Sequence, residues 1–183
     1  MSYEILVQQT PNPNAHKFIV NRDVIAEGKI SYKHINDCVQ NPLAKAVFML
    51  GEIEEVHFFE NVITVTKSDI HPWTVMEEAI RATILQHIEH HDPRFIEKVK
   101  EDTPQTKLSP ELQKIDDILE HTIRPGLRMD GGDLTILNLE GNVLSVQYEG
   151  ACGSCPSSQY GTLEAIQNIL RDEYNPEIEV VTF

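Results

Sequence analysis

The sequence has few of the features that mark many common protein classes. Its three cysteines are an odd number with no disulfide framework around them, which suits a reducing compartment. No window approaches the roughly 20 consecutive apolar residues that a membrane span needs. Basic residues are also scarce, since 15 Lys and Arg stand against 29 Asp and Glu, for a net charge of -14. Such a charge repels phosphate backbones and anionic lipids, so we expect a protein that binds neither nucleic acid nor membrane.

A targeting segment is not recognisable either. The first residues, MSYEILVQQTPNPNAHKF, have neither an apolar signal core nor an Arg-rich amphipathic pattern. We therefore expect a cytoplasmic location.

The chain predicts two small α+β domains. The stretch HHDPRFIEKVKEDTPQTKLSPEL mixes charges, prolines and polar residues with weak apolar periodicity, which is typical of a linker. We place the first domain at residues 1–91, the linker at 92–108 and the second domain at 109–183.

The first domain shows an α+β pattern without visible chemistry. Short strands are predicted at 3–8 and 17–20, a helix in NPLAKAVFML, and a hairpin from EEVHFF and VITVTK. A longer helix is predicted to begin at Pro72, because apolar residues then recur every three or four positions: Trp73, Met76, Ile80, Ile84 and Ile88.

The second domain predicts the order α-β-β-α-β. Ser109 caps a helix whose buried face includes Ile115 and Leu119, and Pro125 kinks or ends it. Strands at 134–139 and 143–148 follow, then a helix with Leu163, Ile166 and Leu170 on one face and a last strand in IEVVTF. The loop with the cysteines joins the second strand to the second helix.

That loop contains Cys152 and Cys155, two residues apart, in EGACGSCPSS. Pro156 fits the first turn of a helix, so Cys155 is expected at or beside an N-cap, where the helix dipole lowers the pKa of a thiol. Gly150 and Gly153 let the backbone turn tightly and approach a bulky ligand. This spacing serves metal or cluster sites and redox dithiols, and it also arises by chance, so all three remain open.

Two longer stretches carry a family resemblance. The runs RPGLRMDGGD (124–133) and YEGACGSCPSSQYGTLEAI (148–166) resemble the NifU-like C-terminal domain of the Nfu iron-sulfur cluster carriers. The first domain is similar to the N-terminal domain found before it in many Nfu proteins, through TPNPNAHKFIV, NPLAKAVF and VITVTK followed by Trp73.

The resemblance implies a function. Nfu proteins bind a 4Fe-4S cluster between two subunits, so Cys152 and Cys155 with their counterparts in a homodimer would supply four thiolates. A 2Fe-2S cluster is the other form that the resemblance allows. The chain would accept a cluster from an upstream assembly scaffold and pass it to apo iron-sulfur proteins, as a carrier and not an enzyme.

Two other functions use the same pair. A dithiol-disulfide oxidoreductase would use Cys152 as nucleophile and Cys155 as resolving thiol, although a thioredoxin-like motif follows the first strand of a βαβ unit. It often has an aromatic residue before the motif, where this chain has Ala151. A structural zinc site shared between two copies is the third reading. Without metal, we expect Cys152 and Cys155 to form an exposed pair.

Several residues near the cysteine motif have a simpler structural interpretation. The Asp130–Asp133 stretch is best explained as a tight turn, with Gly at positive φ and Asp as a cap, and less well by a direct role at the cluster. Ser157 and Ser158 could cap a helix or donate to cluster sulfur.

Residues outside the motif are also read structurally. Cys38 is interpreted as a small buried hydrophobe and Trp73 as a core residue. We interpret His87, His90 and His91 as a solvated helix end in preference to a metal site. The acidic stretches EDTPQ (101–105) and KIDDILE (114–120) are interpreted as solvated faces.

Overall fold

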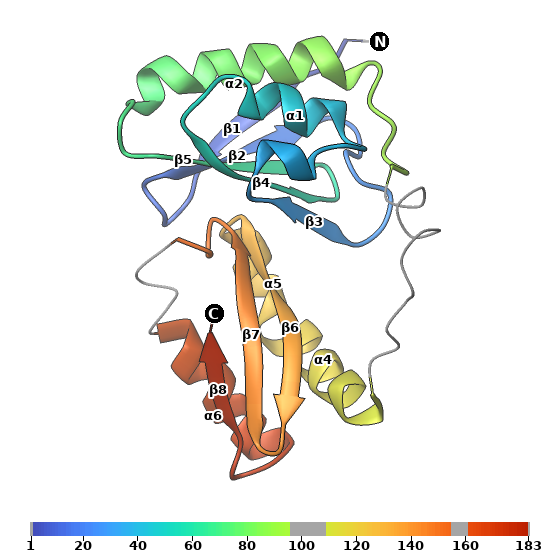
Figure 1. Cartoon of the computed structure of the whole chain (residues 1–183), viewed down its shortest axis with the longest axis vertical. Coiled ribbons are helices and arrows are strands. Elements are labelled where there is room, and N and C mark those ends of the chain that lie inside the picture. The colour runs from blue at the N-terminus through green and yellow to red at the C-terminus, as the bar shows by residue number, and fades with distance from the viewer. Residues whose placement is uncertain (1, 96–108, 155–160, 183) are drawn as a thin grey trace. The chain divides into compact units, whose positions relative to one another are not determined.

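The computed structural model describes residues 2–95, 109–154 and 161–182 (Figure 1). The chain divides into two compact units, residues 1–105 and 106–183. Each unit combines helices with one sheet, which confirms the predicted fold class of two small α+β domains. Of the predicted linker, residues 96–108 lie outside the described residues.

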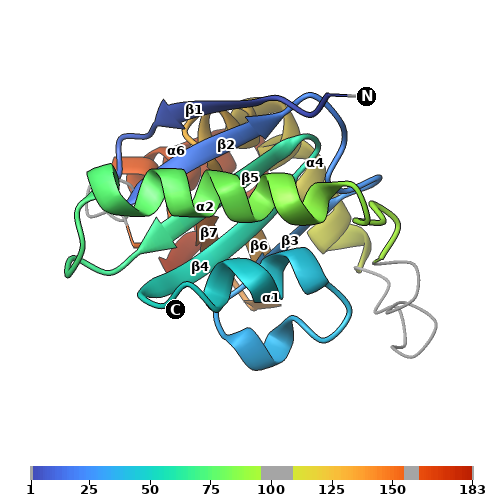
Figure 2. The ribbon, with the colours of Figure 1, turned by 90° about the horizontal axis from the view of Figure 1, so that it is seen from above.

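In its described residues, the first unit is a five-stranded antiparallel sheet with α1 and α2 packed on one face. The sheet order is β1-β2-β5-β4-β3, and Figure 2 shows α1 and α2 running across that face. The strands are β1 (Ile5–Gln9), β2 (Ala15–Val20), β3 (Lys29–Tyr32), β4 (Ile53–Phe59) and β5 (Val62–Lys67). The helices are the 3-10 turn η1 (Ile35–Asp37), α1 (Pro42–Phe48) and α2 (Trp73–Ile88).

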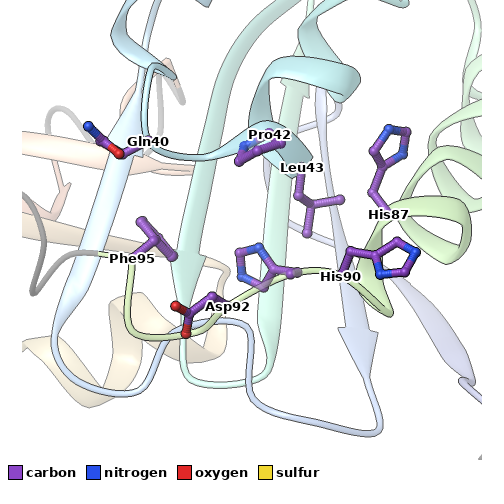
Figure 3. A pocket seen from close by; sticks show the side chains of 8 residues that line it. Gln40, Pro42, Leu43, His87, His90, Asp92 and Phe95 are labelled. Carbon is purple, nitrogen blue, oxygen red and sulfur yellow. The ribbon is translucent and has the colours of Figure 1, made fainter.

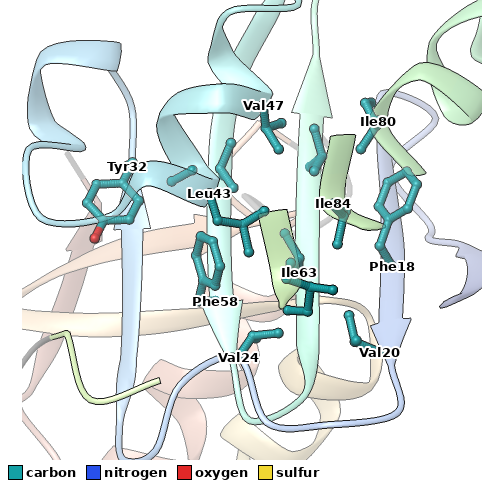
Figure 4. Close-up of a cluster of buried hydrophobic side chains, with 14 of the residues drawn as sticks. Phe18, Val20, Val24, Tyr32, Leu43, Val47, Phe58, Ile63, Ile80 and Ile84 are labelled. Carbon is teal, nitrogen blue, oxygen red and sulfur yellow. The ribbon is translucent and has the colours of Figure 1, made fainter. Parts of the chain in front are cut away.

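The core of the first unit lies between this sheet face and the helices (Figure 4). Alternate strand residues such as Phe18, Phe58 and Ile63 meet Ile80 and Ile84 from α2, and all five are fully buried. The three-to-four spacing in α2 therefore marks a buried face, as predicted. The core also includes Phe95, which packs edge-on against Phe58 with ring centroids 6.1 Å apart.

Two elements of the first unit were not anticipated. The edge strand β3 and the turn η1 occupy residues 29–37, where no strand or helix was predicted. Both elements are short, and a stretch of only three or four residues is too short to show a clear hydrophobic periodicity. The pairing of β3 with β4 supplies the contact that makes Lys29–Tyr32 a strand.

In the part of the second unit that the structure describes, three helices pack against a three-stranded sheet. The helices are α4 (Pro110–Thr122), α5 (Arg124–Met129) and α6 (Leu163–Glu173), and the strands are β6 (Gly132–Glu140), β7 (Val143–Gly150) and β8 (Glu179–Thr182). β6 and β7 pair antiparallel, whereas β8 runs parallel to β7. The predicted order is confirmed, with one addition, the short helix α5.

Proline and serine set the helix boundaries here as expected. The Ser109 hydroxyl accepts a hydrogen bond from the Leu112 amide at 3.2 Å and caps α4. α4 ends at Thr122, and Pro125 occupies the first turn of α5, where its missing N-H costs nothing. The chain thus changes direction immediately before the Asp130–Asp133 stretch. Within the described ranges, none of the helices has the length and apolar character needed to cross a membrane.

Candidate functional site

Cys152 lies in the turn that follows β7, two residues after Gly150. Its side chain is buried, with 2% exposure, and belongs to the hydrophobic core of the second unit. The expectation of an exposed cysteine pair is therefore wrong for Cys152, because the turn places this thiol inward against β6. Cys155, Ser157, Ser158 and the predicted N-cap lie outside the described residues; the described part of α6 begins at Leu163.

The glycines of the Asp130–Asp133 stretch explain how Cys152 is accommodated. Gly131 has a φ of 82°, which favours glycine, and its carbonyl accepts a hydrogen bond from the Ala151 amide at 3.1 Å. A Cβ atom on Gly132 would lie 2.5 Å from the Cys152 Sγ and 2.7 Å from the Glu149 carbonyl oxygen. Gly132 must therefore lack a side chain for the thiol to occupy this position.

The buried carboxylate of Asp133 forms polar contacts that hold the same turn in place. Its side chain is fully buried, and its Oδ1 accepts a hydrogen bond from the Leu134 amide at 2.7 Å. Arg128 donates from Nε to Oδ2 at 3.0 Å. The Arg124 Nε lies 3.4 Å from Oδ1, a charge contact without hydrogen-bond geometry. Asp133 thus joins the glycine turn to two arginines of α5.

Two carboxylates of α4 complete this ion-pair network. Arg124, which is itself buried, donates to Asp116 Oδ1 at 2.5 Å and to Glu120 Oε2 at 3.0 Å. Arg128 also donates to Glu120, at 2.9 Å from Nη2 to Oε2. A buried charge is tolerated when it is paired and hydrogen-bonded in this way. The network ties α4 and α5 to the turn that holds Cys152.

The network shifts the pKa values of its members. Hydrogen bonds from Arg128 lower the pKa of Glu120 to about 2, against a smaller opposing effect of burial and with further help from Arg124. Burial by itself lowers the pKa of Arg124, but the hydrogen bonds and charges of Asp116 and Glu120 outweigh it, so the pKa is raised. Both shifts favour the charged forms that the network needs.

Sequence reasoning missed this network. The stretch KIDDILE was interpreted as a solvated face. Asp116 and Glu120 do keep 26% and 41% of their side chains exposed, but both are also paired with arginines, which that interpretation did not include. The signal was present, because Asp116, Glu120, Arg124 and Arg128 follow at intervals of four, the spacing that brings side chains together on a helix. The predicted helix break at Pro125 made this spacing look as if it did not lie on one continuous helix. The other acidic stretch, EDTPQ, lies outside the described residues.

Tyr148 is the aromatic neighbour of the thiol. Its hydroxyl is buried and has no hydrogen-bond partner among the described residues. Burial raises the pKa of Tyr148 to about 12, and the nearby charge of a Cys152 thiolate contributes in the same direction. A glycine turn and a neutral phenol are therefore among the described neighbours of Cys152.

The remaining candidates lie in the first unit. Cys38 is fully buried, and burial, with a contribution from Asp37, raises the pKa of its thiol to about 11. This confirms the interpretation of Cys38 as a small buried hydrophobe. Trp73 is only half-buried and packs at the edge of the core.

The three histidines at the end of α2 line a pocket of about 300 Å³ (Figure 3). His90 is exposed, but His91 is buried and its Nε2-H donates to the Val24 carbonyl at 2.6 Å. The predicted solvated helix end therefore holds for His90 and fails for His91. Within residues 2–95, 109–154 and 161–182, no three His, Cys, Asp or Glu side chains are grouped so that they could hold a metal ion.

Comparison with known protein families matches both units. Residues 5–91 match the family model "Scaffold protein Nfu/NifU N terminal", and residues 115–181 match the "NifU-like domain". The chain is 32% identical over 183 residues to the human protein "NFU1 iron-sulfur cluster scaffold homolog, mitochondrial", covering 97% of this chain and 70% of the relative. It is 28% identical to the Arabidopsis thaliana "NifU-like protein 4, mitochondrial", covering 91% of this chain but only 61% of that protein.

Solved structures include a partial counterpart. The solution structure of a NifU-like protein from Saccharomyces cerevisiae covers 48% of this chain and 79% of its own, at 20% identity and a TM-score of 0.44. A likeness at this level carries no conclusion about function.

Proposed function

This chain belongs to the Nfu/NifU family of iron-sulfur cluster scaffold proteins, and from that premise we propose that it carries a cluster on Cys152 and Cys155. The observation that carries the proposal is the placement of Cys152. A glycine turn that no side chain could enter, fixed by a buried ion-pair network, holds this thiol at the end of β7. The turn thus keeps the Cys152 thiol in one defined position, from which cluster loading would bring it to the iron.

The cluster is a 4Fe-4S cluster shared by two copies of the chain, with 2Fe-2S as the other form. Each copy supplies two thiolates, and the pair of copies supplies the four that such a cluster takes. Because Cys152 is buried in the described fold, loading turns its side chain outward to meet the second copy. A shared cluster is easier to hand over than an enclosed one, since separation of the copies removes two of its ligands.

Transfer is ligand exchange and not catalysis. A thiolate of an apo iron-sulfur protein replaces a cysteine of this chain at each iron in turn, so one iron-sulfur bond forms as another breaks and no electron is transferred. The chain receives its cluster from an assembly scaffold by the same exchange. The cytoplasmic location stays a prediction, since both relatives named above carry the word mitochondrial in their names.

The test is anaerobic reconstitution of the full chain with iron and sulfide, followed by iron and sulfide counting and native mass spectrometry. We expect a coloured dimer with about four irons and four sulfides. Cys152→Ala and Cys155→Ala should each abolish loading, whereas Cys38→Ala serves as the matched control, because Cys38 is buried in the other unit.

Three outcomes would overturn the proposal. Loading that survives both substitutions would exclude this pair as the ligands. A colourless protein that cycles a disulfide and reduces test substrates would favour the oxidoreductase. A protein that retains zinc and unfolds with chelator would favour the structural metal site.

A further inference from the structure

A second pocket lies in the first unit, far in sequence from Cys152 and Cys155. It has a volume of about 390 Å³ and opens where the start of α2 meets the paired ends of β1 and β2. A volume near 400 Å³ is at the lower end of the range of roughly 300–1,000 Å³ common for ligand sites, which suits one side chain. Its lining residues are Gln9, His16, Trp73, Thr74, Glu77 and Glu78.

The aromatic wall of this pocket is rigidly held. The indole Nε1-H of Trp73 donates to the Pro13 carbonyl at 2.8 Å, in the turn that TPNPN forms. The His16 ring stacks on the indole with centroids 3.8 Å apart and an angle of 6° between the planes. The ammonium of Lys67 lies 5.4 Å from the indole centroid and donates to the Ser68 carbonyl at 3.0 Å. The wall is therefore formed before any ligand arrives.

His16 brings an acceptor atom to the pocket. Its side chain is only 7% exposed, and Nδ1 lies 3.1 Å from Glu77 Oε2. Burial lowers the pKa of the imidazole more than Glu77 raises it, so the ring is neutral near pH 7. Since a carboxylate only accepts, Nδ1 carries the hydrogen and Nε2 holds a lone pair. Among the described residues, none forms a hydrogen bond with Nε2.

The charge around the pocket is negative. Glu77 and Glu78 both line it, and each keeps a considerable exposed fraction, 42% and 78% of the side chain. The charge of Lys67 reaches His16 and lowers the pKa of its imidazole, but the Lys67 ammonium is already held by the Ser68 carbonyl and the Trp73 ring. A ligand would thus meet the imidazole lone pair and the carboxylates of Glu77 and Glu78, of which Glu78 also pairs with the Arg81 Nη1 at 3.6 Å. The net charge of -14 adds attraction at long range for anything basic.

We propose that this pocket binds a positively charged side chain, a lysine or an arginine, presented by a partner protein. The donors of an ammonium or guanidinium group match the acceptors Nε2 of His16 and the carboxylates of Glu77 and Glu78, and the methylene stem lies along Trp73. A metal ion would need at least one more grouped ligand than the described residues offer. The inference is independent of the cluster chemistry, because it concerns the other unit.

The test uses Trp73, which is the single tryptophan of the chain, as a reporter inside the pocket. The full-length apo protein is titrated with short peptides that carry one lysine or one arginine between alanines. A peptide with norleucine, which keeps the stem and loses the charge, is the neutral control. We expect a saturable change in tryptophan fluorescence with the charged peptides alone, and the tighter of the two identifies which cation the pocket prefers.

Three variants distinguish binding in this pocket from non-specific attraction to the negatively charged protein. Glu77→Gln should weaken binding about fivefold, as expected for a partly exposed carboxylate-cation pair. Glu89→Gln, at the other end of α2, removes the same charge from an exposed residue and should leave binding unchanged. His16→Phe keeps the stacking on Trp73 but removes the acceptor, and should also weaken binding.

Defined results would overturn this inference. They are a fluorescence response that never saturates, an equal response to the norleucine peptide, or equal losses in Glu77→Gln and Glu89→Gln. A nitrogen-15 shift measurement on the His16 ring gives a second readout, because a bound cation should move the Nε2 signal and leave Nδ1 nearly unchanged. Cluster loading plays no part in these measurements, so failure here leaves the proposed carrier function standing.

Discussion

The two units solve the problem of buried polar groups in different ways. In the first unit, buried polar side chains form separate hydrogen bonds, as when His91 donates to the Val24 carbonyl or the Asn41 carbonyl oxygen accepts from the Ala44 amide. Others, such as the Thr64 and Thr66 hydroxyls, have no hydrogen-bond partner among the described residues. In the second unit, Arg124 and Asp133 are both buried and belong to one network of charges. Substitutions in separate pairs should change the free energy of unfolding independently, whereas substitutions within one network should be coupled.

The difference follows from what each unit has to position. The first unit has a large apolar core between five strands and two helices. Its buried polar groups do not have to position a turn, so separate hydrogen bonds are enough. The second has three strands and must hold a tight glycine turn against a thiol. Charges anchored across two helices fix that turn more firmly than apolar contacts alone, because ion pairs specify direction as well as distance.

Removal of Asp133 should produce the largest effect and confine it to the second unit. Asp133→Ala leaves Arg128 and Arg124 short of one buried carboxylate, which should cost about 3 kcal/mol of unfolding free energy. Amide hydrogen exchange of residues 109–154 measures that loss, while urea unfolding followed by Trp73 fluorescence reports the first unit.

The Trp73 transition is the internal control for this variant. It should stay where it is in the unmodified protein. A shift of both transitions together would mean that the units do not unfold independently, and the comparison between them would fail.

A methyl group on Gly132 should have the next largest effect. Gly132→Ala places a Cβ 2.5 Å from the Cys152 Sγ, so the thiol or the turn must shift, at a cost of about 1–3 kcal/mol. We also expect slower cluster loading, measured by absorbance during reconstitution.

Gly126→Ala is the matched control, because a Cβ at this helical glycine meets nothing within 4 Å. That variant should load normally and gain about 0.5–1 kcal/mol of stability from its better helix propensity. If the two alanine variants loaded equally fast, the glycine turn would have no part in holding Cys152.

Lowering the pH should destabilise the second unit less than either substitution does. The pKa of Glu120 falls from its ordinary 4.5 to about 2 in the folded protein, so its contribution is complete above pH 4.5 and is lost as the pH falls towards 2. Hydrogen exchange of the second unit as a function of pH should show this loss, and Glu120→Gln should flatten the curve in that window.

Glu111→Gln, at an exposed position of the same helix, is the comparison for the acid experiment. It should keep the full pH dependence of the unmodified protein. An unchanged curve in Glu120→Gln would show that other carboxylates carry the acid sensitivity.

Much of the fold follows from local pattern. The spacing of Ile80, Ile84 and Ile88 was enough to give the buried face of α2, and Pro125 was enough to end α4. Short elements without periodicity, such as β3, could not be predicted from local pattern, because their pairing with a neighbouring strand is what makes them strands.

The sequence by itself determined the two α+β units and the family, and it gave Cys152 and Cys155 as candidate ligands, because apolar periodicity, turn residues and motif spacing are local properties of the chain. Only the tertiary structure decided that Cys152 is buried beside Gly132 and that His16 stacks on Trp73. These contacts join residues from different elements. Their existence depends on how the elements pack, and local spacing carries no information about packing across such distances.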